Sequence, residues 1–172
     1  MTDSLRRQLR ALPDFPDNLP LFDPATAPAD PIALFLDWLG QALAAGLPAP
    51  HAFSLATATP EGAVSSRMLI LKDIEAGAFC FASTRSSRKG GELAGNPQAA
   101  LNFYWPAVGR QIRVVGTVSL RSADASAADW NDRPGADGSA NPAWQLYALH
   151  PTEVEFWQAS ADRHHIRHRY AL

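Results

Sequence analysis

Cations and hydroxyl groups gather at the ends of two apolar runs between residues 65 and 89. Arg67 opens the first run and Lys72 closes it, while the second run leads through the polar segment Ser83–Ser87 to Arg88 and Lys89. Guanidinium and ammonium groups pair with phosphate oxygens, and hydroxyl or backbone N–H donors complete such a shell. The pattern predicts either a site for a phosphorylated, planar ligand or a hairpin with a solvated basic end, because surface cations are common.

Composition limits the classes of protein that fit this chain. Its 172 residues, 47% of them hydrophobic and 19% charged, predict one globular unit with a substantial core. A net charge of -2 argues against nucleic acid or a membrane surface as the main partner. An anion site must therefore be a local cluster of cations.

Cys80 is the single cysteine, so neither an intrachain disulfide nor a zinc site built from several cysteines can form within one chain. This usage fits a reducing cytoplasm. Because Cys80 stands between Phe79 and Phe81, we expect a buried structural thiol rather than a nucleophile. The chain has neither an apolar run of about 18 residues nor the apolar core of a signal peptide, so no membrane span is predicted.

Several common catalytic and binding motifs are absent from the sequence. It has no G-x-G-x-x-G, no G-x-x-x-x-G-K-[ST] and no G-x-S-x-G segment. His164, His165 and His168 could offer helix-spaced metal ligands, but the Glu of an H-E-x-x-H site is missing, and we expect no metal site.

The chain divides at about residue 29. Residues 1–29 are rich in proline and predict an irregular arm with a short helix at Ser4–Leu12, either mobile or wrapped around a partner subunit. Residues 30–172 are expected to form a single domain. It opens with a helix from Pro31 to Ala45, which Asp30 caps and Gly46 ends.

Short strands joined by turns follow this helix and predict an antiparallel barrel. The expected strands run from His51 to the turn at Pro60, then over Val64–Leu71, Ala78–Ser83, Ala99–Trp105, Arg110–Leu120 and Thr152–Gln158. Short helices are expected at Arg88–Gly95, after Ser87 as its cap, and at Ser122–Asn131. Residues 133–142 are interpreted as a loop and residues 161–172 as a basic tail. A phosphate beside the start of the helix at Arg88 would gain from its free N–H groups.

Short segments scattered along most of the chain carry a resemblance to a known family. They are RMLILK at 67–72, SRK at 87–89, NP at 96–97, FYWP at 103–106, RQIRV at 110–114, RP at 133–134, EFWQ at 155–158 and R-x-H-x-R at 163–167. In this order and spacing the chain resembles the pyridoxamine 5′-phosphate oxidase family from about Asp30 to Arg169. The resemblance implies a mainly β fold with flanking helices, an antiparallel Greek-key split β-barrel that binds FMN at the interface of a homodimer.

The resemblance also implies roles for individual residues. The implied cofactor-binding residues are Arg67, Met68, Leu69, Ile70, Leu71, Lys72, Ala82, Ser83, Arg88, Lys89, Gln111, Trp157 and Arg167. The implied substrate-binding residues are Lys72, Arg133, Arg163 and His165, of which Arg163 and His165 are also the implied catalytic pair. The implied reaction oxidises a small phosphorylated pyridine, pyridoxamine or pyridoxine 5′-phosphate, to pyridoxal 5′-phosphate, and dioxygen is reduced to hydrogen peroxide.

The chain departs from the family pattern on the substrate side. Asp129 and Asp137 replace a tyrosine and a serine that contact the substrate phosphate in the family, and two acids would repel a phosphate. Ala82 replaces an aromatic residue, and the short segment 135–154 lacks a Gln-Ser pair that helps to bind FMN. A strand beyond Tyr170 is also missing. Two alternatives therefore stay open: a flavin oxidoreductase with another substrate, such as a ring-dehydrogenating enzyme, or a non-catalytic protein that binds FMN or pyridoxal phosphate.

Overall fold

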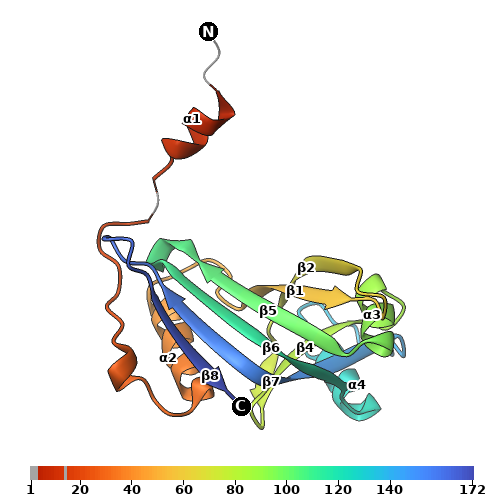
Figure 1. The fold of residues 1–172 in the computed structure, drawn as a ribbon. Coiled ribbons are helices and arrows are strands. Elements are labelled where there is room, and N and C mark those ends of the chain that lie inside the picture. Colours follow the sequence, from red (N-terminus) through yellow and green to blue (C-terminus); the bar gives the residue numbers. More distant parts are fainter. Residues whose placement is uncertain (1–3, 14) are drawn as a thin grey trace.

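The fold is an antiparallel split β-barrel, seen in a computed structural model that describes residues 4–13 and 15–172 (Figure 1). The strands of its sheet lie in the order β2-β1-β5-β6-β7-β4-β3, and β8 pairs with β7 beside this path. Their bounds are β1 Ala52–Ala58, β2 Val64–Ile70, β3 Asp73–Glu75, β4 Ala78–Thr84, β5 Gln98–Trp105, β6 Arg110–Leu120, β7 Trp144–Gln158 and β8 Ile166–Ala171. The prediction of a mainly β, antiparallel barrel is confirmed.

The long strand β7 connects the two parts of the barrel. Its first part, from Trp144 to Leu149, pairs with β4, and its last part, from Glu153 to Gln158, pairs with β8. β6 follows β7 along both parts, with a register shift between Val115 and Gly116. One step on β6 at this shift corresponds to two steps on β7, from Glu153 to Pro151, so Thr152 is an extra residue in β7. A bulge bends the strand that carries it, and β7 therefore bends where its two paired regions meet.

Helix α2 (Pro31–Ala44) closes one side of the core, as Figure 1 shows. The Asp30 side chain accepts a hydrogen bond from the Ile32 N–H at 2.9 Å, which confirms the expected cap. Phe35 is fully buried, and its ring lies 5.0 Å from those of Phe79 and Phe103. Leu34, Phe35, Trp38 and Ala42 form the buried face of this helix and pack against the inner face of the sheet. The apolar spacing of the helix also predicts Leu36 and Leu43 as core residues, and this is wrong, because they are 52% and 62% exposed.

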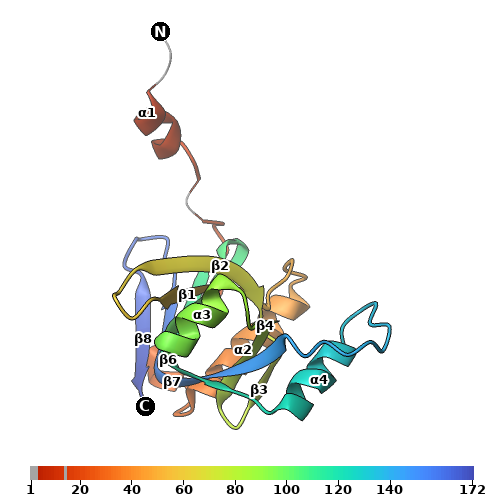
Figure 2. The same ribbon diagram turned by 90° about the vertical axis from the view of Figure 1, so that its right-hand side faces the viewer.

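The remaining helices lie at the ends of the barrel and along the arm (Figure 2). They are α1 (Leu5–Arg10), the 3-10 helices Pro24–Thr26 and Pro106–Val108, α3 (Arg88–Gly95) and α4 (Ala123–Asn131). The predicted helix in the arm is present as α1, which projects away from the barrel in Figures 1 and 2. No helix in the described part of the chain is both long and apolar enough to cross a membrane.

Three strands differ from the sequence prediction. β3 is absent from the expected strands and pairs with β4. β7 begins at Trp144, well before the expected Thr152, because the segment up to Leu149 pairs with β4 and is buried. The expected basic tail forms strand β8, in which His168 and Tyr170 face inward while Arg167 and Arg169 face solvent. The sequence did not predict β8 because His168, which faces inward, is a polar residue and interrupts the apolar–polar alternation that indicates a strand.

Candidate active site

Arg88 and Lys89 occupy the first turn of α3, beside two serines. Ser87 caps the helix, since its Oγ accepts the Gly90 N–H at 3.3 Å, and it also accepts the Lys89 Nζ at 3.3 Å. The Ser83 Oγ, from the end of β4, lies 3.4 Å from the Ser87 Oγ. Free backbone N–H groups, hydroxyl groups and two cations thus meet at one helix N-terminus, an arrangement suited to a phosphate.

Arg67 approaches the same place from β2. Its Nη2 lies 3.3 Å from a carboxylate oxygen of Glu92, and its Nη1 donates to the Leu55 carbonyl at 3.3 Å. Burial and the positive charge of Arg67 together lower the pKa of Lys89. Arg67, Arg88 and Lys89 therefore form one group, which we call the cation cluster.

Glu92 lies beneath the cation cluster and is the one acid in contact with it among the described ion pairs. Its side chain is 4% exposed, and Arg88 Nε donates to it at 2.8 Å. The Ser65 Oγ donates to both carboxylate oxygens, at 2.9 and 2.7 Å, and Thr57 donates as well. These hydrogen bonds lower the pKa of Glu92 to about 2, although burial alone would raise it. The bonds from Thr57 and Ser65 have the largest effects.

The predicted flavin-lining segment Met68–Leu71 belongs to the edge strand β2 and the residue after it. β2 pairs with β1 on one side and ends the sheet order on the other, so part of its backbone is open to a ligand. Met68 and Ile70 are exposed, whereas Leu69 and Leu71 pack against the core. Leu71 is tied to the barrel by its N–H, which donates to the His51 carbonyl at 2.8 Å.

Gln111, Trp157 and Arg167 line up on the outer face of the barrel. Strand register places Tyr104 opposite Gln111, Gln111 opposite Trp157, and Trp157 opposite Arg167. The four side chains, which we call the outer row, surround a surface hollow of about 520 Å³ that Phe15 of the arm also lines. A flat aromatic ring beside an amide and a guanidinium can bind a planar heterocycle.

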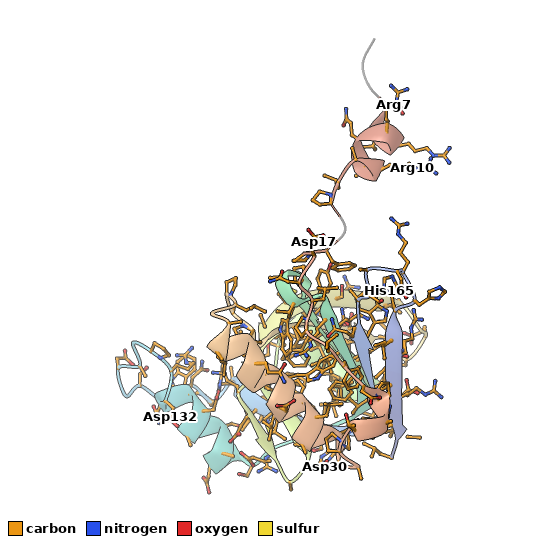
Figure 3. The ribbon with its side chains drawn as sticks, turned by 90° about the vertical axis from the view of Figure 1, so that its left-hand side faces the viewer. Arg7, Arg10, Asp17, Asp30, Asp132 and His165 are labelled. Carbon is orange, nitrogen blue, oxygen red and sulfur yellow. The ribbon has the colours of Figure 1, made fainter. Side chains whose placement is uncertain are left out.

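Arg163 and His165 stand next to the outer row, in the loop between β7 and β8. They line a hollow of about 310 Å³ with residues of the arm, among them Asp17, which Figure 3 labels at the same end of the barrel as His165. The His165 ring lies 4.8 Å from that of Trp157, and its Nδ1 accepts the Ser160 N–H at 3.1 Å. Arg163 has a φ of 64°, a left-handed conformation that costs a non-glycine residue free energy.

Both predicted phosphate contacts on the substrate side already have protein partners. Lys72 Nζ lies 3.3 Å from the Asp129 carboxylate, whose other oxygen accepts the Trp144 Nε1–H at 2.7 Å. The Arg133 guanidinium lies 3.2 Å from the centre of the Trp130 ring and 5.0 Å from that of Trp144. Asp137 is close enough for the charge of Arg133 to contribute, after the hydrogen bonds of Ser139, to lowering its pKa.

The predicted residues thus form separate groups within one chain. Arg67 belongs to β2 and Gln111 to β6, and strands β1 and β5 lie between them in the sheet. Three strand spacings amount to about 14 Å. Ala82 is buried in a second small core with Leu146 and Ala148, so its side chain packs internally.

Some residues of the site were missed by sequence reasoning. Glu92 could have been found, since it follows Arg88 by four residues in a predicted helix, a spacing typical of helical ion pairs. Thr57 and Ser65 bind Glu92 across two other strands, and no local pattern predicts that contact. Phe15, whose ring lies 5.7 Å from that of Trp157, comes from the arm and gave no signal.

Substitution of Arg88 by alanine tests the cation cluster. If the cluster holds the phosphate of FMN, as the family resemblance implies, FMN affinity should fall by about 1–3 kcal/mol, towards the lower value because solvent screens an exposed guanidinium. Flavin fluorescence titration measures the loss. Arg121→Ala, which removes a cation paired with Glu75 instead, is the control and should leave FMN affinity unchanged. Equal affinities of wild type and Arg88→Ala would remove Arg88 from the phosphate site.

The family model and the sequence relatives that match the chain point to the same family. The family model described as pyridoxamine 5′-phosphate oxidase matches residues 39–158. The chain is 37% identical over 176 residues to the pyridoxine/pyridoxamine 5′-phosphate oxidase of Bordetella avium (84% of each chain covered) and 38% identical to that of Cupriavidus taiwanensis (83% of each).

Solved structures agree in fold. PhzG from Burkholderia lata, in complex with tetrahydrophenazine-1-carboxylic acid, superposes with a TM-score of 0.84 at 30% identity, covering 93% of this chain and 94% of that one. An FMN-binding protein related to pyridoxamine 5′-phosphate oxidase, from Nostoc punctiforme, shares the fold with a TM-score of 0.60 at 17% identity, over 79% of this chain and 95% of that one. The chain therefore belongs to the pyridoxamine 5′-phosphate oxidase family.

Proposed function

We propose that the chain is an FMN-dependent oxidoreductase that works as a homodimer. The observation that carries this proposal is the cation cluster at the N-terminus of α3, where Lys89 donates to the hydroxyl of Ser87 and Arg67 and Arg88 share the carboxylate of Glu92. This donor set fits the dianionic phosphate of FMN in both charge and hydrogen bonding.

A second copy of the chain is needed to complete the proposed site. The cation cluster and the outer row are separated by two strands within one chain, so a flavin with its phosphate in the cluster would meet the outer row of a partner subunit. The outward face of β2 supports this arrangement, because Val64, Met68 and Ile70 are 70%, 65% and 43% exposed. An apolar row on an edge strand suits an interface between subunits.

In the proposed site, one set of residues binds FMN and another orients the substrate. FMN, when bound, supplies the capacity to accept a hydride equivalent from the substrate and to pass the electrons to dioxygen. The cation cluster holds the phosphate, while Gln111, Trp157 and Arg167 of the outer row flank the ring. Arg163 orients the substrate through its charge. Because the His165 Nδ1 accepts the Ser160 N–H, the neutral ring carries its proton on Nε2, where it can donate to the substrate.

Pyridoxine or pyridoxamine 5′-phosphate is one candidate substrate. Its support is the name of the curated relatives and the presence of Lys72, Arg133, Arg163 and His165 at the positions that the family uses.

A substrate without a phosphate group is the second candidate, and the geometry favours it. Asp129 neutralises Lys72 at 3.3 Å, and two tryptophans hold the guanidinium of Arg133. A phosphate would have to displace these partners and approach the carboxylates of Asp129 and Asp137. A partly reduced ring acid is the kind of molecule bound to PhzG of Burkholderia lata. It would bring less negative charge than a phosphate ester close to Asp129 and Asp137.

The decisive experiment offers both substrate classes to the FMN-loaded protein. Bleaching of the flavin absorbance without oxygen, and peroxide formation with oxygen, are measured with pyridoxine 5′-phosphate, pyridoxamine 5′-phosphate and tetrahydrophenazine-1-carboxylic acid. We expect rapid bleaching by the reduced ring acid and slow bleaching by the phosphate esters. The opposite ranking would establish the phosphate esters as substrates, and a protein that binds FMN without bleaching would be a carrier.

Asp129→Asn tests the reason for that ranking. Removing the carboxylate frees Lys72 from its ion pair, while the asparagine oxygen still accepts the Trp144 Nε1–H. We expect kcat/KM for pyridoxine 5′-phosphate to rise about tenfold, which corresponds to about 1.4 kcal/mol. Asp124→Asn, in the first turn of the same helix and outside the hollow that Lys72 and Asp129 line, is the matched control. An unchanged kcat/KM in Asp129→Asn would mean that Asp129 does not select against phosphate.

A further inference from the structure

We propose that Glu92 is a positioning residue of the FMN-phosphate site, which holds Arg67 and Arg88 in place and sets the net charge of the cation cluster. The inference rests on the proposed function, because it assumes that this cluster binds the phosphate of FMN.

The first argument is the position of Glu92 among three elements. Its carboxylate accepts hydrogen bonds from Thr57 on β1, from Ser65 on β2 and from Arg88 on α3. The Glu92 side chain is 4% exposed, so its bonds to Thr57 and Ser65 form away from bulk water, while Arg88 reaches it from the solvent side. A buried carboxylate that joins two strands and a helix fixes the place of each partner, and α3 is thereby set against the open edge of the barrel.

The second argument concerns Arg67, which Glu92 holds both directly and through hydroxyl groups. Arg67 Nη2 lies 3.3 Å from the carboxylate and also donates to Ser65, while Nη1 donates to Thr57. The hydroxyls of Thr57 and Ser65 donate hydrogen bonds to Glu92, so their oxygens can accept hydrogen bonds from Arg67. The guanidinium therefore has a fixed plane before any phosphate arrives, which lowers the entropic cost of binding.

The third argument is charge. Arg67, Arg88 and Lys89 carry three positive charges close together, and the lowered pKa of Lys89 reflects both its burial and its repulsion by Arg67. Glu92 brings the net charge of the cluster to two, which matches a phosphate dianion. Its pKa of about 2 means that this compensation persists throughout the neutral range.

The test compares FMN with riboflavin, which lacks the phosphate, in the variant Glu92→Gln. The amide retains an oxygen for Thr57 and Ser65 but loses the charge that holds Arg67 and Arg88. We expect FMN to bind about tenfold more weakly and riboflavin to bind as in the wild type, as judged by quenching of flavin fluorescence. Glu61→Gln, in the exposed turn between β1 and β2, is the matched control and should change neither affinity.

A double-mutant cycle shows whether Glu92 acts on FMN binding through Arg67. If it does, Glu92→Gln should weaken FMN binding much less in an Arg67→Ala background than in the wild type. The loss that remains is the part that Glu92 exerts through Arg88. If Glu92→Gln does not fold, Ser65→Ala, which removes one hydroxyl between Arg67 and Glu92, should give the same selective loss of FMN affinity in a smaller degree.

Four outcomes would overturn the inference. Equal weakening of FMN and riboflavin would assign Glu92 a general structural role, and unchanged or tighter FMN binding would show that its negative charge gives no benefit. Additive losses in the cycle would exclude action through Arg67. A wild-type protein that binds neither flavin would overturn the proposed function together with this inference, which distinguishes that failure from the others.

Discussion

Replacing Arg163 with alanine should lower kcat/KM by about 10²–10³-fold while leaving FMN affinity unchanged. Removal of one preorganised charge or donor at a reacting centre typically has an effect of this size. Arg163 lines the hollow next to His165 and lies outside the cation cluster, so its loss should affect the substrate and not the phosphate of FMN. Steady-state kinetics and a flavin titration on the same protein measure the two effects separately.

Arg163→Gly provides the matched variant, since it lacks the same side chain but tolerates the left-handed backbone. The φ of 64° strains an alanine at this position and does not strain a glycine. We expect Arg163→Gly to be about 1 kcal/mol more stable than Arg163→Ala in urea unfolding, with equally low activity. If the alanine variant were as stable as the glycine variant, the backbone of residue 163 would not be strained; if either variant mainly released flavin, Arg163 would belong to the cofactor site.

Gly116→Ala should destabilise the protein by about 3 kcal/mol, at the upper end of the range for overpacked sites. A Cβ at this position would overlap the His150 carbonyl oxygen and would lie 2.9 Å from the Pro151 Cα. These atoms are backbone, so no change of rotamer relieves the contact. The site lies at the register shift between β6 and β7, where the regions of β7 that pair with β4 and β8 meet.

Gly40→Ala is the control for this substitution. Gly40 is an exposed residue of α2, and a Cβ added to it would meet no atom within 4 Å, so alanine should raise stability by about 0.5–1 kcal/mol through helix propensity. Chemical unfolding of both variants measures the difference. A Gly116→Ala protein as stable as the wild type would show that the strands separate easily at the register shift.

The sequence by itself determined the elements with strong local signals. Asp30 and Pro31 mark the start of α2, and Ser87 marks the start of α3. The alternation from Ile112 to Leu120 marks β6, although Leu120 itself is 64% exposed and not buried as its place in the alternation predicts. Each signal depends on residues a few positions apart, so it can be read without the fold. The ordered set of short family segments added the split barrel, which the structure confirms.

Only the tertiary structure decided how the charged residues are partnered. Lys72 meets Asp129 across 57 positions of sequence, and Arg67 meets Glu92 across 25. A charge pattern shows that cations are present but not whether an acid from a distant element neutralises them. The short segment 135–154 contains the start of β7, and the basic tail forms β8, because pairing with an existing strand overrides weak local propensity.

The stretch between residues 65 and 89 combines features that the sequence predicts with features that only the fold decides. Its cations are visible in the sequence, and the cap at Ser87 predicts a helix N-terminus beside them. Three other features depend on the order of the strands. They are the pairing of Arg67 with Glu92, the distance between this stretch and the outer row, and the open edge of β2. Strand order is set by contacts between residues far apart in the chain, which is why the sequence predicted the groups that could bind a phosphate and the fold decided which of them are available.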